Sequence, residues 1–202
     1  RPHLPYVAPT EYYGRFNWGP GDDNVTDPTT PEIVLPPFNQ PFTDEAGFRQ
    51  SLEGYYACTA MSDDHVGDLL DKLDATGLAA NTIVVVFGDN GYGLGEHDNF
   101  FSKGTPDNVG FHVPLIFRVP GGKRVDEAEA KAVTLLDIYP TLVELCGLPD
   151  PETPLDGKSL VPLLDKHDPN WVEEAYALIG GSKEPADPLG GLIWAQGHKY
   201  YE

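Results

Sequence analysis

The stretch that decides the fold is Thr82-Ile-Val-Val-Val-Phe-Gly-Asp-Asn-Gly-Tyr-Gly-Leu-Gly-Glu-His97. Its residues 83–87 form a continuous apolar run rich in β-branched side chains, which predicts a strand buried on both faces. The run stops at Gly88, and further glycines stand at positions 91, 93 and 95. Glycine disfavours regular structure and lets the backbone turn tightly, so we expect a strand followed by a turning, glycine-rich loop.

Asp89 and Asn90 stand where the predicted strand ends. In an open α/β sheet, ligands bind just beyond the carboxyl ends of the strands. A carboxylate and an amide oxygen at that place suit a hard cation such as calcium or magnesium. By themselves, Asp, Asn and Gly in succession most often form a turn. The triplet therefore predicts a turn, and its position after a strand makes that turn a candidate metal site.

Composition limits the class of protein. The chain has 202 residues and a hydrophobic content of 40%, enough for a globular core. A formal net charge of −19 argues against nucleic acid and anionic membrane surfaces as partners. That charge is compatible with calcium, although solubility alone explains it better. We find no apolar run of membrane-spanning length, so no membrane insertion is expected.

The rest of the chain predicts alternating helices and strands. Residues 1–42 are rich in Pro, Gly, Asn and Asp, which indicates an irregular, wrapping segment. Periodicity and turn residues predict helices at 43–77 and 134–146, strands at 83–87 and 112–119, a short helix within 156–164, and strands at 175–179, 192–195 and 199–201. Pro140 predicts a bend in the second long helix. This order indicates an α/β sheet with a small antiparallel appendage.

Several chemically capable residues have structural explanations. Asp63, Asp64 and His65 are adjacent in a predicted helix, where neighbouring positions point in different directions, so a solvated helix face explains them better than a metal site. Cys58 and Cys146 have no metal-ligand spacing. We expect both to be buried free thiols, with a disulfide left open.

Four blocks of sequence follow one another along the chain. They are Arg1-Pro-His-Leu-Pro-Tyr6; Tyr55-Tyr-Ala57 with Asp64-His-Val-Gly67; Phe87-Gly-Asp-Asn-Gly-Tyr-Gly-Leu-Gly-Glu-His97; and the set His112-Val-Pro-Leu-Ile-Phe117, Leu136-Asp-Ile-Tyr-Pro-Thr-Leu142 and Asp156-Gly-Lys-Ser-Leu160. In this order they resemble the sulfatase family of the alkaline phosphatase superfamily, most closely its iduronate-2-sulfatase-like and choline-sulfatase-like branches. The resemblance implies an alkaline-phosphatase-like mixed sheet flanked by helices, present here in part.

The resemblance also implies roles for individual residues. Sulfatases hydrolyse sulfate esters with a formylglycine nucleophile held beside a calcium ion, so calcium is expected rather than magnesium. Asp89 and Asn90 match the family's second pair of metal ligands. His3 matches a histidine that contacts the sulfate or the leaving oxygen, and Lys103 matches a lysine that binds a sulfate oxygen. His97 is expected to order the glycine-rich loop.

The remaining histidines have no firm functional role. His112 precedes a predicted strand and could be structural or lie near the pocket, and the histidines at 65, 167 and 198 are expected at the surface or in packing.

The chain departs from the family pattern in two ways. The segment between His97 and Lys103 is one residue longer than the usual family spacing. The nucleophile motif Cys/Ser-X-Pro/Ala-X-Arg and the first pair of metal-binding aspartates are absent from this sequence, and the family places both N-terminal to the His3 segment. We therefore expect residues 1–165 to be the distal part of a catalytic domain and 166–202 the start of a C-terminal subdomain.

Several functions follow from the resemblance. The first is part of a sulfatase that acts on a sulfated small molecule or saccharide, completed by an N-terminal half and inactive without it. Alternatives are a non-catalytic, truncated or degenerate homologue, and a phosphonate or phosphodiester hydrolase of the same superfamily. Periplasmic, secreted or lysosomal location is implied by the family alone.

Overall fold

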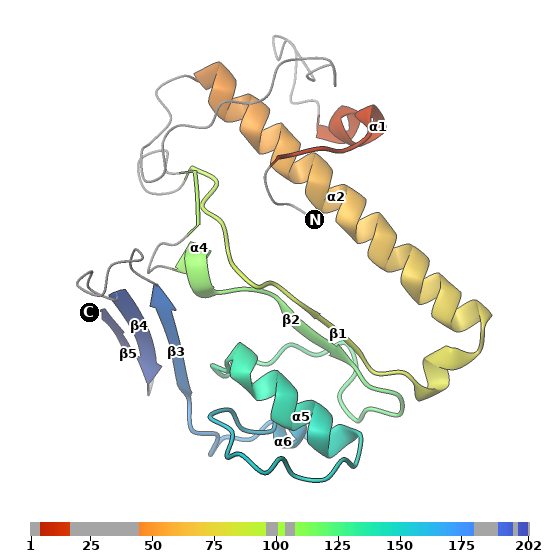
Figure 1. Cartoon of the computed structure of the whole chain (residues 1–202), viewed down its shortest axis with the longest axis vertical. Helices are drawn as coiled ribbons and strands as arrows, with labels where there is room; N and C mark the ends of the chain where they lie inside the picture. The colour runs from red at the N-terminus through yellow and green to blue at the C-terminus, as the bar shows by residue number, and fades with distance from the viewer. Residues whose placement is uncertain are drawn as a thin grey trace. The chain divides into compact units, whose positions relative to one another are not determined.

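Figure 1 shows the chain as a computed structural model, which describes residues 5–16, 45–95, 101–103, 108–179, 190–195 and 198–201. The chain divides into two compact units. Unit 1 comprises Arg1–Thr82 and Tyr92–Lys103, and unit 2 comprises Ile83–Gly91 and Gly104–Glu202. The division into domains at residues 165 and 166 stays a prediction.

Unit 1 is built on one long helix, α2 (Glu45–Ala75), which confirms the helix predicted over 43–77. Gly77 follows it in the left-handed conformation at a φ of 71°, where glycine is favoured, and the short 3-10 helix η2 (Leu78–Asn81) leads onward.

The segment 1–42 is less irregular than predicted. Its described part contains α1 (Thr10–Tyr13) and the 3-10 turn η1 (Gly14–Phe16). Two buried side chains, Tyr12 and Tyr13, hold this helix in the unit 1 core. Seven residues are too few to show a helical period, and the stabilising contacts come from residues far along the chain, so no local pattern predicts this helix.

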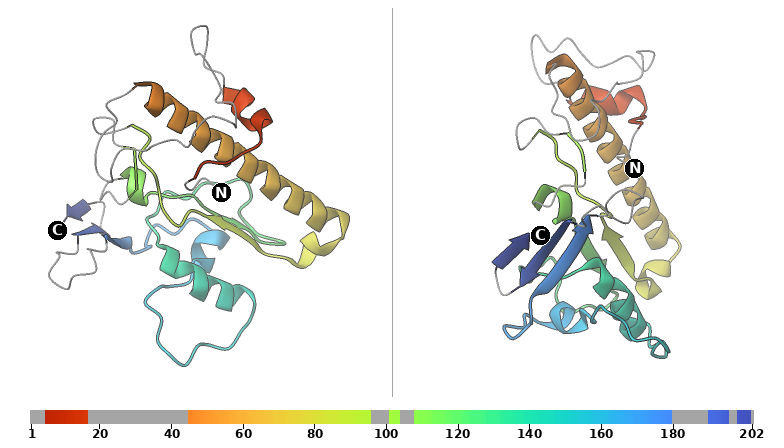
Figure 2. Two further views of the ribbon diagram at one scale, coloured as in Figure 1. Left: turned by 45° about the horizontal axis from the view of Figure 1, so that its top comes forward. Right: turned by 60° about the vertical axis from the view of Figure 1, so that its left-hand side comes forward.

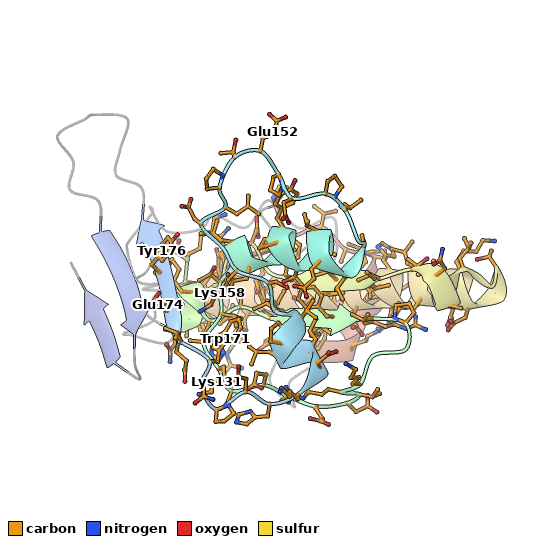
Figure 3. All side chains as sticks on the ribbon, turned by 90° about the horizontal axis from the view of Figure 1, so that it is seen from below. Lys131, Glu152, Lys158, Trp171, Glu174 and Tyr176 are labelled. Carbon is orange, nitrogen blue, oxygen red and sulfur yellow. The ribbon has the colours of Figure 1, made fainter. Side chains whose placement is uncertain are left out.

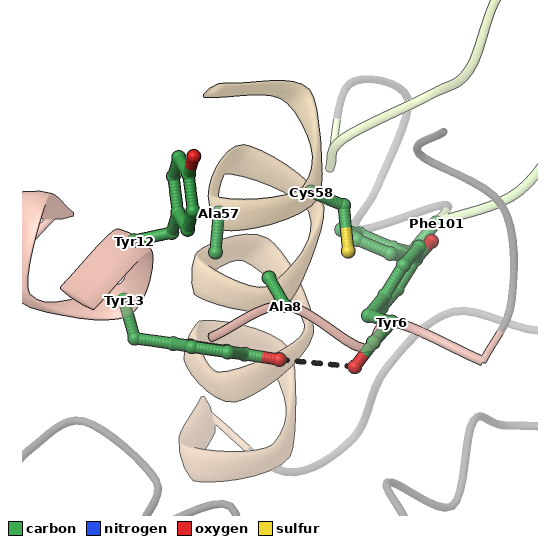
Figure 4. Packing of buried hydrophobic residues seen from close by; sticks show 7 residues of the cluster. All are labelled: Tyr6, Ala8, Tyr12, Tyr13, Ala57, Cys58 and Phe101. Carbon is green, nitrogen blue, oxygen red and sulfur yellow. Dashed lines mark hydrogen bonds between the residues drawn. The ribbon is translucent and has the colours of Figure 1, made fainter. Parts of the chain in front are cut away.

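A cluster of buried side chains forms the core of unit 1 (Figure 4). Its members are Tyr6, Ala8, Tyr12, Tyr13, Ala57, Cys58 and Phe101. The Tyr13 hydroxyl donates a hydrogen bond to the Tyr6 carbonyl oxygen at 2.9 Å. Gly54 of α2 lets the N-terminal segment approach, because a Cβ there would lie 3.0 Å from the Cβ of Tyr6. The N-terminal segment is therefore packed directly onto the helix.

Unit 2 contains the strand pair β1 (Val84–Phe87) and β2 (Leu115–Arg118), which are antiparallel with Val84 opposite Arg118. The short helix α4 (Asn108–Phe111) precedes β2. The strand predicted at 112–119 is therefore shorter than expected. Pro114 explains this limit, since its carbonyl accepts a hydrogen bond from the Gly88 N–H at 3.1 Å but it has no N–H to return.

The prediction that 83–87 is buried on both faces is wrong for this structure. Phe87 is 50% exposed and Ile116, on the partner strand, is 59% exposed. Among the described residues β1 pairs with β2 alone, and the faces of a strand pair are buried only where other segments pack against them.

Residues 134–165 contain three short helical elements and the buried carboxylate of Asp137. The helix predicted over 134–146 divides into η3 (Leu135–Asp137) and α5 (Ile138–Leu145), followed by α6 (Val161–Asp165). Pro140 lies in the first turn of α5, where a missing N–H is tolerated, so the predicted bend is instead a change of helix type at Ile138.

Two charged groups attach neighbouring segments to these helices. Arg124 donates hydrogen bonds to Glu129 at 2.8 Å and to the Leu163 carbonyl at 2.7 Å, and His167 Nδ1 lies 3.2 Å from the same glutamate. Lys158 places its ammonium 4.3 Å from the ring centroid of Trp171 (Figure 3). These contacts fix the surface excursion at 123–131 and the start of the next strand.

The C-terminal strands β3 (Glu174–Ile179), β4 (Gly190–Ala195) and β5 (His198–Tyr201) form a three-stranded antiparallel sheet in the order β3–β4–β5 (Figure 2). This confirms the predicted small antiparallel appendage. Both cysteines are free, but Cys146 is exposed at the end of α5, so only Cys58 is the buried thiol that was predicted for both. None of the described helices is long and apolar enough to cross a membrane.

Candidate functional site

Asp89 and Asn90 follow β1 with Gly88 between, and both are exposed. The turn that carries them is fixed at its two ends within unit 2. Gly88 donates its N–H to Pro114 on one side, and Gly91 donates its N–H to the Gly110 carbonyl at 2.9 Å on the other. The predicted end of the strand is thus confirmed, and the pair is presented on a backbone held at both ends.

Glycine is required at position 91. A Cβ there would lie 1.9 Å from the carbonyl oxygen of Val109, far inside contact distance. The close approach of these two backbones therefore depends on the absence of a side chain, and it is one reason for the glycine that follows the Asp-Asn pair.

The Asp-Asn pair fits part of a calcium shell. It offers one anionic carboxylate and one neutral amide oxygen, which are hard ligands, and both are accessible. In the described part of the chain no group of three or more His, Cys, Asp or Glu side chains could hold a metal ion. Calcium takes roughly six to eight oxygen ligands, so these two residues would supply a minority of its coordination.

Lys103 belongs to unit 1 and follows a well-anchored segment. Phe101, two residues earlier, is 3% exposed in the core. The Gly93 N–H donates a 2.7 Å hydrogen bond to the Ser102 carbonyl, which closes the loop between them at its neck. Because the neck is closed, an additional residue inside the loop need not displace Lys103, whose side chain is partly exposed.

Two of the predicted site residues, His3 and His97, lie outside the described residues. Their roles, like those of the Asp-Asn pair and Lys103, stay predictions. His112 is exposed between α4 and β2. Sequence reasoning gave no role to Tyr92 or Asp137, although both lie within the quoted blocks. Tyr92 acts through contacts with residues distant in sequence, which no local pattern displays. Asp137 contacts the distant Lys158, but it also closes a capping box with Thr134, and the local Thr-x-x-Asp pattern could have pointed to it.

The solvated helix face predicted around residue 64 is confirmed. Asp63 and His65 are exposed, and Asp64 forms an ion pair with Arg15 at 2.8 Å. The hydrogen bond from that guanidinium, followed by one from Tyr12, lowers the pKa of the Asp64 carboxyl. This group therefore has partners of its own and is not a vacant metal ligand.

Known proteins are similar to this chain over most of its length. The ulvan-active sulfatase of Formosa agariphila is 32% identical over 166 residues, covering 81% of this chain and 32% of that protein. Arylsulfatase K of Xenopus laevis is 33% identical over 174 residues, covering 79% and 30% respectively. Iduronate 2-sulfatase of Mus musculus is 27% identical over 241 residues, covering 91% and 42%. The chain thus spans between 30% and 42% of the length of these relatives.

Solved structures share the fold. BT4656 in complex with its substrate D-glucosamine-2-N,6-O-disulfate gives a TM-score of 0.67 at 26% identity, covering 76% of this chain and 32% of that one. The phosphonate monoester hydrolase of Agrobacterium radiobacter also gives 0.67, at 25% identity, covering 78% and 34%. These likenesses confirm the predicted alkaline-phosphatase-like fold.

The profile of the sulfatase family matches residues 1–148, which hold all of the candidate site residues. With relatives above 30% identity over more than two thirds of its length, the chain belongs to the sulfatase family.

Proposed function

We propose that the chain is part of a calcium-dependent sulfatase that hydrolyses sulfate esters of carbohydrates, with a formylglycine nucleophile supplied by sequence outside this chain. The observation that carries the proposal is the position of Asp89 and Asn90, just after β1 in a member of the sulfatase family. A sulfated carbohydrate substrate is supported by the ulvan-active relative and by the disulfated glucosamine bound to the similar structure.

Each candidate residue has a chemical task in this proposal. Asp89 and Asn90 would hold calcium, which when bound supplies Lewis acidity toward the sulfate oxygens. Lys103 would bind a sulfate oxygen as a point charge that complements developing negative charge. His3 would donate a hydrogen bond or a proton to the leaving oxygen, and His97 would order the loop that precedes Lys103.

Substitution of Asp89 tests the proposal in the complete protein that contains this chain. Asp89→Asn retains the shape of the side chain but removes the anionic ligand. Removing a residue that only hydrogen-bonds to a metal ligand typically lowers metal affinity or activity about 10–100-fold. Loss of a ligand itself should cost more, so kcat/KM for an aryl sulfate should fall by more than about 100-fold. Asp63→Asn, on the exposed face of α2, is the matched control and should change activity less than twofold. Near-normal turnover by Asp89→Asn would exclude this residue as a metal ligand.

The 202-residue chain provides a second test. We expect it to bind calcium weakly, since the two ligands leave most coordination sites to water, and to turn over no sulfate ester. Titration calorimetry measures the first and an aryl sulfate assay the second. Tight calcium binding that survives Asp89→Ala, or turnover by the chain alone, would contradict the assignment.

A second candidate is phosphonate or phosphodiester hydrolysis, favoured by the likeness to the phosphonate monoester hydrolase of Agrobacterium radiobacter. Parallel assays with an aryl sulfate and an aryl phosphonate monoester distinguish the two activities. Activity toward the phosphonate alone selects the second candidate. Activity toward neither, in a complete protein loaded with calcium, selects a non-catalytic homologue.

A further inference from the structure

The loop after the Asp-Asn pair alternates glycine with two larger side chains. Residues 91–95 read Gly-Tyr-Gly-Leu-Gly, so Tyr92 and Leu94 alone can anchor this segment by side-chain packing. Both pack against the buried cluster of unit 1. Glycine leaves a backbone free to move unless neighbouring contacts hold it. The order of this loop therefore depends on these two anchors.

Tyr92 is the larger anchor and makes specific ring contacts. Its ring stacks on Tyr55 of α2, with 5.4 Å between centroids and 30° between planes. It also meets Phe101 edge-to-face, at 5.4 Å and 74°. Tyr55 lies on the long helix and Phe101 is fully enclosed, so both partners belong to the rigid part of the unit.

The same contacts determine the backbone that leads to Lys103. Tyr92 immediately precedes Gly93, and Phe101 immediately precedes Ser102, so the ring pair lies beside the hydrogen bond that closes the neck of the loop. Lys103 is the next residue after Ser102. Loss of the contact between Tyr92 and Phe101 would free the Gly93 side of the hydrogen bond to Ser102, and the backbone of Lys103 would then be held less firmly.

The contacts of Tyr92 with Tyr55 and Phe101 are made by the rings. Tyr6 contacts Phe101 edge-to-face at 6.5 Å. Burial, followed by the interaction of its hydroxyl with that of Tyr92, raises the pKa of Tyr6, but within the described part of the chain this buried hydroxyl makes no hydrogen bond of regular geometry. A hydroxyl that has no good partner adds no stabilisation to the cluster. Phenylalanine at position 92 keeps both ring contacts and should therefore replace Tyr92 with little loss, whereas an aliphatic residue should not.

We propose that Tyr92 is a positioning residue for Lys103, acting through its ring contacts with Tyr55 and Phe101. The inference rests on the proposed function, in which Lys103 binds a sulfate oxygen. It adds a specific dependence. Binding of the sulfate oxygen by Lys103 requires an aromatic ring at position 92, although this ring does not itself contact the substrate.

A double-substitution experiment in the complete protein tests this dependence. A misplacement of about 1 Å can cost up to 10²-fold in rate, so Tyr92→Leu should lower kcat/KM for an aryl sulfate about ten- to a hundredfold. Tyr92→Phe should stay within twofold of the parent. In a Lys103→Ala background, Tyr92→Leu should have no further effect, because its influence passes through the lysine. Additive losses from Tyr92→Leu and Lys103→Ala would overturn the proposal.

Lysine labelling in the 202-residue chain supplies a readout that needs no activity. The acetylation rate of Lys103, measured by mass spectrometry relative to the exposed Lys72 of α2, should rise at least threefold in Tyr92→Leu and remain unchanged in Tyr92→Phe. Phe16→Leu is the control, since Phe16 stacks on Tyr56 at 5.5 Å and the rings of Tyr56 and Tyr55 lie between it and Tyr92.

The two tests separate the two proposals. If the complete protein hydrolyses no sulfate ester, the proposed function fails, and the labelling ratio still decides whether Tyr92 positions Lys103. An unchanged ratio in Tyr92→Leu, or an equal rise in Phe16→Leu, overturns the positioning role whatever the activity.

Discussion

The buried carboxylate of Asp137 holds two segments of unit 2 together, and Asp137→Asn tests how much it contributes. The side chain is 3% exposed. One oxygen accepts a hydrogen bond from the Thr134 N–H at 2.8 Å, and the other accepts one from the Lys158 N–H at 2.9 Å. Asparagine has nearly the same shape but only one acceptor oxygen. One of the two N–H groups must then face an amide NH₂, which cannot accept its hydrogen bond.

The cost follows from these contacts. A buried N–H without an acceptor costs about 1–3 kcal/mol, and the remaining hydrogen bond loses the assistance of the negative charge. We therefore expect Asp137→Asn to reduce the free energy of unfolding by about 2–4 kcal/mol. For a chain of this size each kcal/mol corresponds to about 2–4 °C, so the melting temperature should fall by roughly 4–16 °C.

Urea unfolding and thermal melting of the 202-residue chain measure this loss. Hydrogen exchange adds a local readout, since the Lys158 amide should lose protection before the amides of α2 do. Asp156→Asn is the matched control, because Asp156 is exposed two residues from Lys158 and should change the unfolding free energy by less than about 0.5 kcal/mol. If Asp137→Asn unfolds like the parent, or Asp156→Asn loses as much, the carboxylate does not act as described.

Three further predictions concern single positions. Gly91→Ala should destabilise unit 2 by about 1–3 kcal/mol in urea unfolding, because the added Cβ meets the Val109 carbonyl. A cost below about 0.5 kcal/mol would show that the backbones at positions 91 and 109 separate freely. Iodoacetamide should alkylate the exposed Cys146 in the folded chain much faster than Cys58, whose pKa is raised by burial; equal rates measured by mass spectrometry would contradict the burial of Cys58. Burial alone would raise the pKa of Glu129, but hydrogen bonds from Arg124 and His167 lower it to about 2. The Glu129 carboxylate therefore contributes fully to stability above its ordinary pKa of 4.5, and this contribution is lost as the pH falls through about 2. The difference in unfolding free energy between the parent and Glu129→Gln should therefore shrink as the pH falls from 4.5 to 2, and a difference independent of pH over that range would refute this account.

The sequence predicted those parts of the fold that local pattern determines. The helix α2 carries a helical period over many turns, and β1 is an unbroken apolar run rich in β-branched residues and ended by glycine, so both were placed within two residues of their ends. The small antiparallel sheet was also recognised, because alternating strands and turns mark it. The helix α1 was missed, since it has four residues and depends on contacts made from outside its own segment.

The candidate site was predictable to the same extent. The position of Asp89 and Asn90 after β1 follows from the apolar run that ends at Gly88, which is visible in the sequence itself. The exposure of Phe87 does not, because it depends on which segments pack against the face of β1 that carries it. The packing of Tyr92 and Phe101 joins positions nine residues apart with a loop between them, a contact that neither helical nor strand periodicity encodes.

The uncovered strand pair has a consequence for the behaviour of the chain in solution. β1 consists of Val-Val-Val-Phe with no charged or proline residue to discourage pairing with another molecule, and the partner strand exposes Ile116. The net charge of −19 opposes such contact by mutual repulsion between chains. Salt weakens that repulsion within a Debye length of about 10 Å at 0.1 M and leaves the apolar edge unaffected. The isolated chain should therefore remain dispersed in dilute buffer and self-associate as ionic strength rises, with its colloidal stability set by charge rather than by a covered surface.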